Sequence, residues 1–129
     1  MSAESPVATG YVRRDFDRPE LRWELVHGEA DLFDDGTVRL IETPGHSAGH
    51  MSLLVNLKRT GPVLLTADAA DNRAQWEGRA HPRALHSRGD ANRSLESLRR
   101  IAREMEPLIV FGHDPANWSG LTHAPAHYS

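Results

Sequence analysis

Three segments of the chain end in residue types that bind divalent metal ions. VRLIETPGH leads to His46, VLLTAD to Asp68, and LIVFGHD to His113. Each segment contains an apolar run, so we expect each to be a strand whose polar end leaves the core. Imidazole nitrogen and carboxylate oxygen bind Zn²⁺ and similar cations at about 2.0–2.2 Å, and strand ends hold such ligands rigidly. The pattern indicates a metal site, although His and Asp at strand ends also serve as turn formers and caps.

Two histidines stand four residues apart in the segment TPGHSAGH. On a helix this spacing would let both side chains share one metal ion. However, Pro44 disfavours helix at the residue before it, and Gly45 and Gly49 are poor helix formers. We therefore expect a loop, in which His46 and His50 have separate roles.

The apolar runs predict a sheet built from neighbouring strands. The turn signal DDG separates Leu32 and Phe33 from the run at 38–41, which indicates a β-hairpin. Segments 51–57 and 63–68 are joined by RTGP, so we expect them to pair antiparallel. The stretch that follows, up to residue 89, mixes charges with Pro and Gly and predicts an irregular segment with one helical turn.

The clearest helix covers 90–106, with Asp90 as the expected N-cap. Apolar residues recur there at helical intervals, with Arg and Glu on the opposite side. The stripe consists of Leu95, Leu98, Ile101 or Ala102, and Met105. The run at 107–114 and the earlier run at 63–68 both predict strands that are buried on both faces.

Composition limits the kinds of partner. The 129 residues, 39% hydrophobic, suit one domain, and 15 Lys+Arg against 18 Asp+Glu give no reason to expect nucleic acid. Without cysteine, a metal must be bound by His and carboxylates. The beginning of the chain has no apolar run of signal or membrane-span length, so we expect a cytoplasmic protein with no membrane partner. Residues 1–14 are expected to be a flexible or truncated start.

TPGHSAGH, LLTADAADN and FGHD, with a charged amphipathic helix between the last two, resemble the C-terminal half of the metallo-β-lactamase fold. Within that fold they most resemble the quorum-quenching N-acyl homoserine lactone lactonases, over about Asp15 to Trp118. The resemblance implies an α/β (α+β) class and half of an αββα sandwich. This half would be a mostly antiparallel or mixed sheet with one main covering helix, and residues 1–129 would form a single partial domain.

The resemblance also implies a set of metal ligands. His46 corresponds to a ligand of one metal, Asp68 to the aspartate that bridges two metals, and His113 to a ligand of the second metal. The complete site would hold two zinc ions about 3.5–4 Å apart, or Mn, Fe or Co in their place. His50 does not correspond to a ligand, and we expect it to tie the loop to nearby backbone.

The sequence departs from the family pattern at two points. The HxHxDH signature, which supplies four ligands and the aspartate usually implicated in proton transfer, does not occur. The other close histidine pairs, His81 with His86 and His123 with His127, lack the aspartate and are expected on the surface. Some relatives have a substrate-contacting tyrosine three residues after the bridging aspartate, where this chain has Asp71.

Two functions remain open from the sequence. The chain is the C-terminal half of a hydrolase in which metal-bound hydroxide attacks a small lactone or ester, although phosphodiester and thioester hydrolysis also occur on this fold. Alternatively, it is a non-catalytic truncated remnant that binds metal weakly or pairs with a separate N-terminal half. In either case one sheet face should lack its cover, so we expect self-association or pairing with a complementary half.

Overall fold

The computed structural model describes residues 12–129, so most of the predicted start segment at 1–14 lies outside the described residues. The elements are α1 (Arg13–Phe16), β1 (Glu29–Asp31), β2 (Val38–Glu42), β3 (Met51–Leu57), β4 (Gly61–Ala67), α2 (Arg73–Trp76), α3 (Arg88–Met105), β5 (Leu108–Phe111) and α4 (Pro115–Ser119). Among the described residues, no helix combines the length and apolar character needed to cross a membrane.

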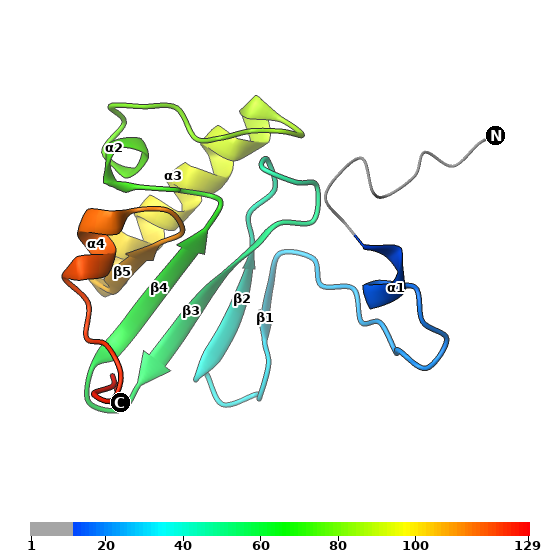
Figure 1. Ribbon diagram of the computed structural model, residues 1–129, viewed down its shortest axis with the longest axis horizontal. Helices are drawn as coiled ribbons and strands as arrows, with labels where there is room; N and C mark the ends of the chain where they lie inside the picture. The colour runs from blue at the N-terminus through cyan, green and yellow to red at the C-terminus, as the bar shows by residue number, and fades with distance from the viewer. Residues whose placement is uncertain (1–11) are drawn as a thin grey trace.

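The strands form one mixed sheet in the order β1-β2-β3-β4-β5 (Figure 1). The first four strands pair antiparallel through short connections, whereas β5 pairs parallel with β4 after the crossover that contains α3. The antiparallel pairing of β3 with β4 confirms the sequence prediction. The mixed sheet with one main covering helix is the predicted architecture.

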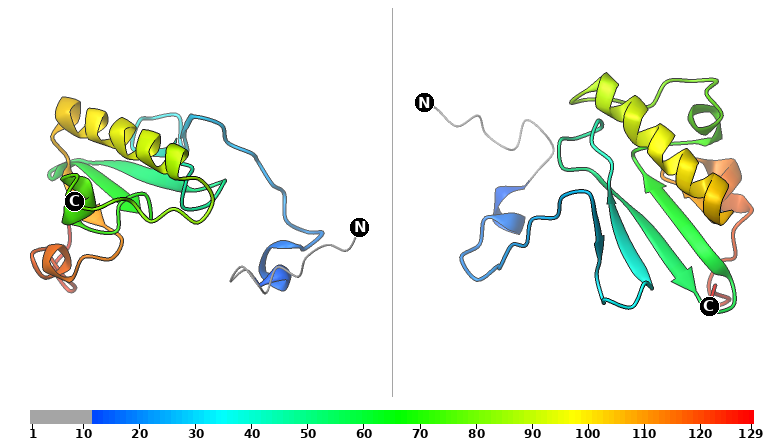
Figure 2. Two further views of the ribbon diagram at one scale, coloured as in Figure 1. Left: turned by 90° about the horizontal axis from the view of Figure 1, so that it is seen from above. Right: turned by 180° about the vertical axis from the view of Figure 1, so that it is seen from behind.

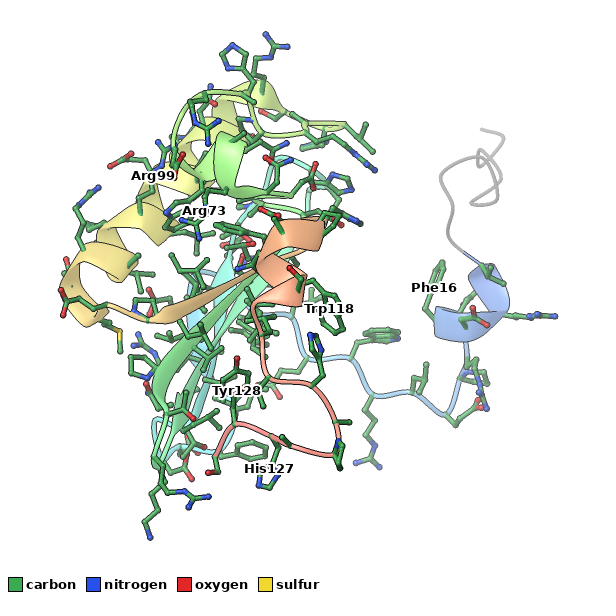
Figure 3. All side chains as sticks on the ribbon, turned by 60° about the vertical axis from the view of Figure 1, so that its left-hand side comes forward. Phe16, Arg73, Arg99, Trp118, His127 and Tyr128 are labelled. Carbon is green, nitrogen blue, oxygen red and sulfur yellow. The ribbon has the colours of Figure 1, made fainter. Side chains whose placement is uncertain are left out.

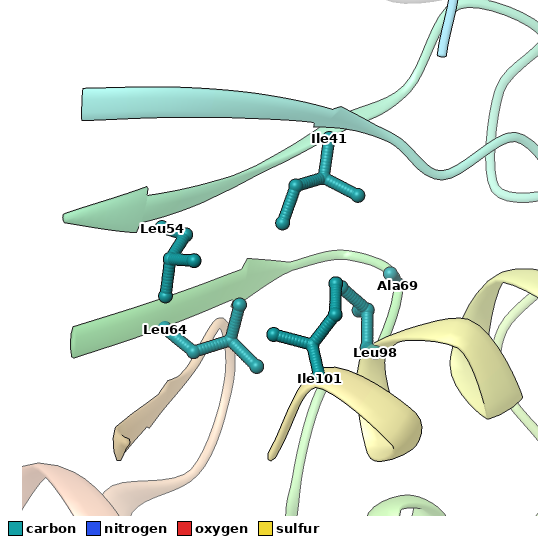
Figure 4. Packing of buried hydrophobic residues seen from close by; sticks show 6 residues of the cluster. All are labelled: Ile41, Leu54, Leu64, Ala69, Leu98 and Ile101. Carbon is teal, nitrogen blue, oxygen red and sulfur yellow. The ribbon is translucent and has the colours of Figure 1, made fainter. Parts of the chain in front are cut away.

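Helix α3 covers one face of the sheet, and the core lies between them (Figure 4). The predicted apolar stripe supplies Leu95, Leu98 and Ile101, which are all buried. The main cluster consists of Ile41, Leu54, Leu64, Ala69, Leu98 and Ile101. Full burial of one such aliphatic side chain contributes about 1.5–3 kcal/mol, so this face accounts for much of the fold's stability.

The start of α3 differs from the prediction. The N-cap is Ser87 rather than Asp90, because Ser87 has an extended backbone and its hydroxyl accepts a hydrogen bond from the Asp90 N–H at 3.2 Å. Asp90 instead lies in the first helical turn, where its negative charge interacts favourably with the helix dipole. The helix ends where Glu106 adopts a left-handed conformation before Pro107.

The hairpin also differs in its first strand. β1 covers 29–31, and Leu32 and Phe33 lie in the connecting loop, 48% and 66% exposed. The Asp31 carboxylate accepts hydrogen bonds from the N–H groups of Phe33 and Gly36, which closes the loop before β2 begins. This local capping takes precedence over the strand propensity of the two apolar residues.

The second face of the sheet is mostly apolar and only partly covered. Because residues paired in register point to the same side, this face carries Val38, Leu40, Leu53, Val55, Val63, Leu65, Leu108 and Val110. α4 and the C-terminal segment with Tyr128 lie on this side, opposite α3 (Figures 2 and 3). Leu65 remains 36% exposed, so the prediction that β4 is buried on both faces is wrong at this position.

The loop after β2 packs tightly against the start of α3. Gly45 has a φ of 140°, and a Cβ at this position would lie 2.4 Å from the Cα and N atoms of Ala91. The Gly45 carbonyl accepts hydrogen bonds from the N–H groups of His86 and Ser87. Only glycine allows this close approach, which sets the position of the following His46.

We predict that Gly45→Ala lowers the free energy of unfolding by about 1–3 kcal/mol, because the added methyl group overlaps the α3 backbone. Urea denaturation measures the change. Gly49→Ala in the same loop is the matched control, since a Cβ at Gly49 meets nothing within 4 Å. Equal stability of the two variants would contradict the tight packing of this loop on α3.

Candidate metal centre

The chain turns sharply at the C-terminal end of β4 and places Asp68 directly after that strand. The pairing with β5 is irregular between Leu65 and Ala67, and Ala67 has a positive φ of 47°. Such bulges redirect the chain at the end of a strand. A Cβ on Gly112 would lie 2.6 Å from the Ala67 carbonyl oxygen, so glycine is required where β5 approaches the bulge. This contact brings the next residue, His113, beside Asp68.

The structure brings together the three residues that the sequence predicted as ligands. His113 Nε2 lies 2.8 Å from Asp68 Oδ1, and His46 Nε2 lies 3.6 Å from Asp68 Oδ2. The Asp68 carboxylate therefore faces one imidazole with each oxygen. This is the arrangement expected of a bridging aspartate, and the ligand role of the three residues stays a prediction.

The accessibility of the three side chains differs. The His46 side chain is 14% exposed and that of Asp68 34%, whereas that of His113 is 61% exposed. His46 Nδ1 lies 3.3 Å from the Arg83 carbonyl oxygen, which leaves Nε2 free to face Asp68. Metal-binding histidines commonly use the second ring nitrogen for such a contact, because it fixes the orientation of the ring.

His50 ties its loop to the backbone of Asp68, which is the structural role that the sequence predicted. The Asp68 N–H donates to His50 Nε2 at 3.1 Å, and Nδ1 therefore carries the proton and donates to Thr43 Oγ1 at 2.8 Å. The Thr43 hydroxyl contacts Ser52 Oγ, which donates to the Thr66 carbonyl. Burial lowers the pKa of His50, against the attraction of Asp68, and this favours the neutral ring that the two hydrogen bonds require.

Two aspartates near the centre had no assigned role from the sequence. Asp114 is the N-cap of α4, since its carboxylate accepts hydrogen bonds from the N–H groups of Asn117 and Arg73. These backbone hydrogen bonds, that of Asn117 first, lower the pKa of Asp114. The Asp-Pro pair is a sequence signal for this cap, because Pro is favoured at the first helical position. The cap connects the start of α2 to α4, directly after His113.

The second aspartate is Asp71, which is buried and close to the predicted ligands. Ligand atoms of Asp68, Asp71 and His113 all lie within 4.8 Å of one another. The carboxylate oxygen Oδ1 of Asp71 is buried without a hydrogen-bond partner. A set of imidazole and carboxylate donors with one unpaired buried oxygen fits a divalent cation.

The side chains of the other close histidine pairs lie on the surface. His81, His86, His123 and His127 are exposed, as the sequence predicted. Of these, His123 contacts the ring of Trp118, with 4.6 Å between the ring centroids. This contact joins the C-terminal segment to α4.

The mixed sheet, its covering helix α3 and the cluster around Asp68 define the C-terminal half of a metallo-β-lactamase fold. The fold matches a solved N-acyl homoserine lactone hydrolase with the product N-hexanoyl-L-homoserine bound at its catalytic metal centre. The TM-score is 0.76 at 30% identity, over 86% of this chain and 43% of that one. No protein-family model matches the chain.

The sequence is homologous to the N-acyl homoserine lactonases. It is 46% identical over 124 residues to AttM of Rhizobium johnstonii, which covers 93% of this chain and 47% of that protein. It is 34% identical over 96 residues to AiiA of Bacillus thuringiensis subsp. kurstaki, which covers 74% of this chain and 37% of that protein. The chain thus spans about half the length of the curated relatives it matches.

We predict that His50→Leu lowers the free energy of unfolding by about 1–3 kcal/mol, because the Asp68 N–H and the Thr43 hydroxyl lose their shared partner. Leu keeps a similar volume, so the change isolates the polar contacts. Urea denaturation monitored by circular dichroism measures it. His86→Leu is the control, because that side chain is exposed, and an equal loss there would rule out a specific role for His50.

Proposed function

We propose that the chain is the C-terminal half of a metal-dependent hydrolase that opens small lactones, with N-acyl homoserine lactones as the substrate class. The observation that carries the proposal is Asp68 between His46 and His113, in a chain 46% identical to an N-acyl homoserine lactonase. Quorum quenching and a cytoplasmic location stay predictions from the sequence.

The three residues have separate roles in this proposal. Asp68 offers one oxygen toward His46 and the other toward His113, so it can serve two cations at once. His46 is held by the loop on α3, and His113 is held by its N–H, which donates to the Asp71 carbonyl at 2.7 Å. Zinc is the proposed ion, with Mn, Fe or Co as alternatives that accept the same ligands. When bound, these cations activate water and stabilise negative charge on a carbonyl oxygen.

The exposure of the centre suits a reaction with a small substrate. The His113 side chain is 61% exposed, so a ligand can approach it from solvent. Because the printed sequence has no HxHxDH segment, a second half must supply the remaining ligands and the proton-transfer group. The partly covered second face of the sheet supports the proposal that this half packs there.

We predict that the purified 129-residue chain hydrolyses N-hexanoyl homoserine lactone at close to the background rate. Adding the other half of R. johnstonii AttM as a separate polypeptide should raise the rate, and a chelator should remove the gain. A pH-indicator assay of ring opening measures it. In the mixture, Asp68→Asn should abolish activity while His86→Ala, at an exposed position, should not.

Strong, chelator-sensitive turnover by the chain alone would contradict the need for a second half. No activity in any mixture, despite measurable association of the two polypeptides, would favour the non-catalytic remnant.

We further predict that the chain without a partner self-associates through its second sheet face. Leu65→Ser should weaken the association, because Leu65 is an apolar residue of that face and is 36% exposed. Light scattering over a concentration series measures the change. Phe33→Ser is the control, since Phe33 is 66% exposed but lies in the β1–β2 loop. A monomer with no apolar surface detectable by dye binding would contradict the prediction.

A further inference from the structure

The buried carboxylate of Asp71 is the feature of the site that the proposed function does not explain. Asp71 is 8% exposed and stands three residues after Asp68. Some relatives of the lactonase family have a tyrosine at this position. A carboxylate cannot replace the apolar ring of tyrosine, and burying it without a compensating partner is unfavourable. Its surroundings must therefore account for the charge.

Hydrogen bonds hold Asp71 in one orientation. The Asp71 N–H donates to Gln75 Oε1 at 2.7 Å, and Gln75 Nε2 donates back to Asp71 Oδ2 at 3.2 Å. Arg99 of α3 in turn donates to the backbone carbonyls of Gln75 and Trp76, which fixes α2 (Figure 3). The Asp71 carbonyl accepts the His113 N–H, so the two residues are joined through the backbone.

One carboxylate oxygen is left without a partner. Among the described residues, Asp71 Oδ1 is the buried side-chain polar atom that has no hydrogen bond. A buried acceptor without a donor is unfavourable, and more so when it is charged. Gln75 already uses its amide on Oδ2, so it cannot satisfy Oδ1 in the same orientation. A cation would remove this cost.

The neighbouring ligand atoms lie where such a cation would be bound. Ligand atoms of Asp68, Asp71 and His113 lie within 4.8 Å of one another. Two ligands at about 2.1 Å from one ion are separated by at most about 4.2 Å, so small side-chain rotations complete the shell. An ion here takes the place of the proton that joins His113 Nε2 to Asp68 Oδ1.

We propose that Asp71 is a protein ligand of a divalent cation that is also bound by Asp68 and His113. The inference rests on the proposed metal centre and adds a ligand to it. Three protein ligands and one open position are the usual complement of a catalytic zinc site. The C-terminal half then holds one cation by itself, with His46 left for the second. Gln75 is the residue that orients the new ligand.

Zinc titration of the intact chain tests the inference by isothermal calorimetry, with ZnCl₂ as the probe. Wild type should bind one Zn²⁺ at this centre, and Asp71→Asn should weaken binding by about tenfold or more, because it removes a charged ligand and keeps the shape. Glu77→Gln is the matched control, since it removes an equal charge from an exposed position just after α2. It should leave the dissociation constant unchanged.

A second readout separates a ligand from a structural residue. At saturating Co²⁺, Asp71→Asn should change the visible absorption bands of the bound ion, because one ligand is exchanged. The metal-free variant should melt no lower than wild type, because the neutral amide removes the buried negative charge. Asp71→Ala provides the same two measurements if Asn disturbs the contact with Gln75.

Three outcomes would overturn the inference. In the first, Zn²⁺ binding is lost in His113→Ala but unchanged in Asp71→Asn, which leaves the proposed function intact. In the second, the Co²⁺ spectrum is unchanged while the metal-free variant loses stability, which assigns Asp71 a structural role. In the third, wild type binds no cation. The activity of the reconstituted mixture tests the proposed function separately in every case.

Discussion

The position of the Asp68 carboxylate is the constraint on which the rest of the site depends. It is set by the bulge at the end of β4, where the backbone of Ala67 is left-handed, and by the hydrogen bond from the Asp68 N–H to His50. β5 can reach the bulge only because Gly112 has no side chain. These features fix the backbone on both sides of Asp68, so its two oxygens face different histidines.

Much of this fold could be predicted from the sequence, because its strands and long helix are periodic. The segment 51–57 is a strand with the predicted bounds, and the apolar stripe of α3 faces the core. Short-range capping was less visible. Asp31 closes its loop and Ser87 caps α3 through side-chain hydrogen bonds, which hydrophobic periodicity does not report. The two incorrect predictions, the extent of β1 and the N-cap of α3, both concern where an element begins or ends.

The candidate site was predictable to a similar extent. His46, Asp68 and His113 were predicted to lie together because each stands where an apolar strand leaves the core, and the resemblance to the lactonases implied their roles as ligands. Asp71 was not singled out beside them, because it follows the strand by three residues and its approach to His113 depends on the parallel pairing of β4 with β5. That pairing is a long-range feature. A single sequence gives the position of Asp71 along the chain but not its burial or its unpaired oxygen.

Two of the proposed ligands, His46 and Asp68, are held from the side of the sheet that α3 covers. The loop of His46 rests on α3, where Ser94 donates a hydrogen bond to the Pro44 carbonyl at 2.7 Å. Asp68 is tied through His50 to the buried Thr43 and Ser52. None of these contacts involves the partly covered second face of the sheet. The geometry of this half of the site is therefore formed before any partner packs on that face. If a covering half supplies the remaining ligands, as we propose, it need not reorganise the residues already in place.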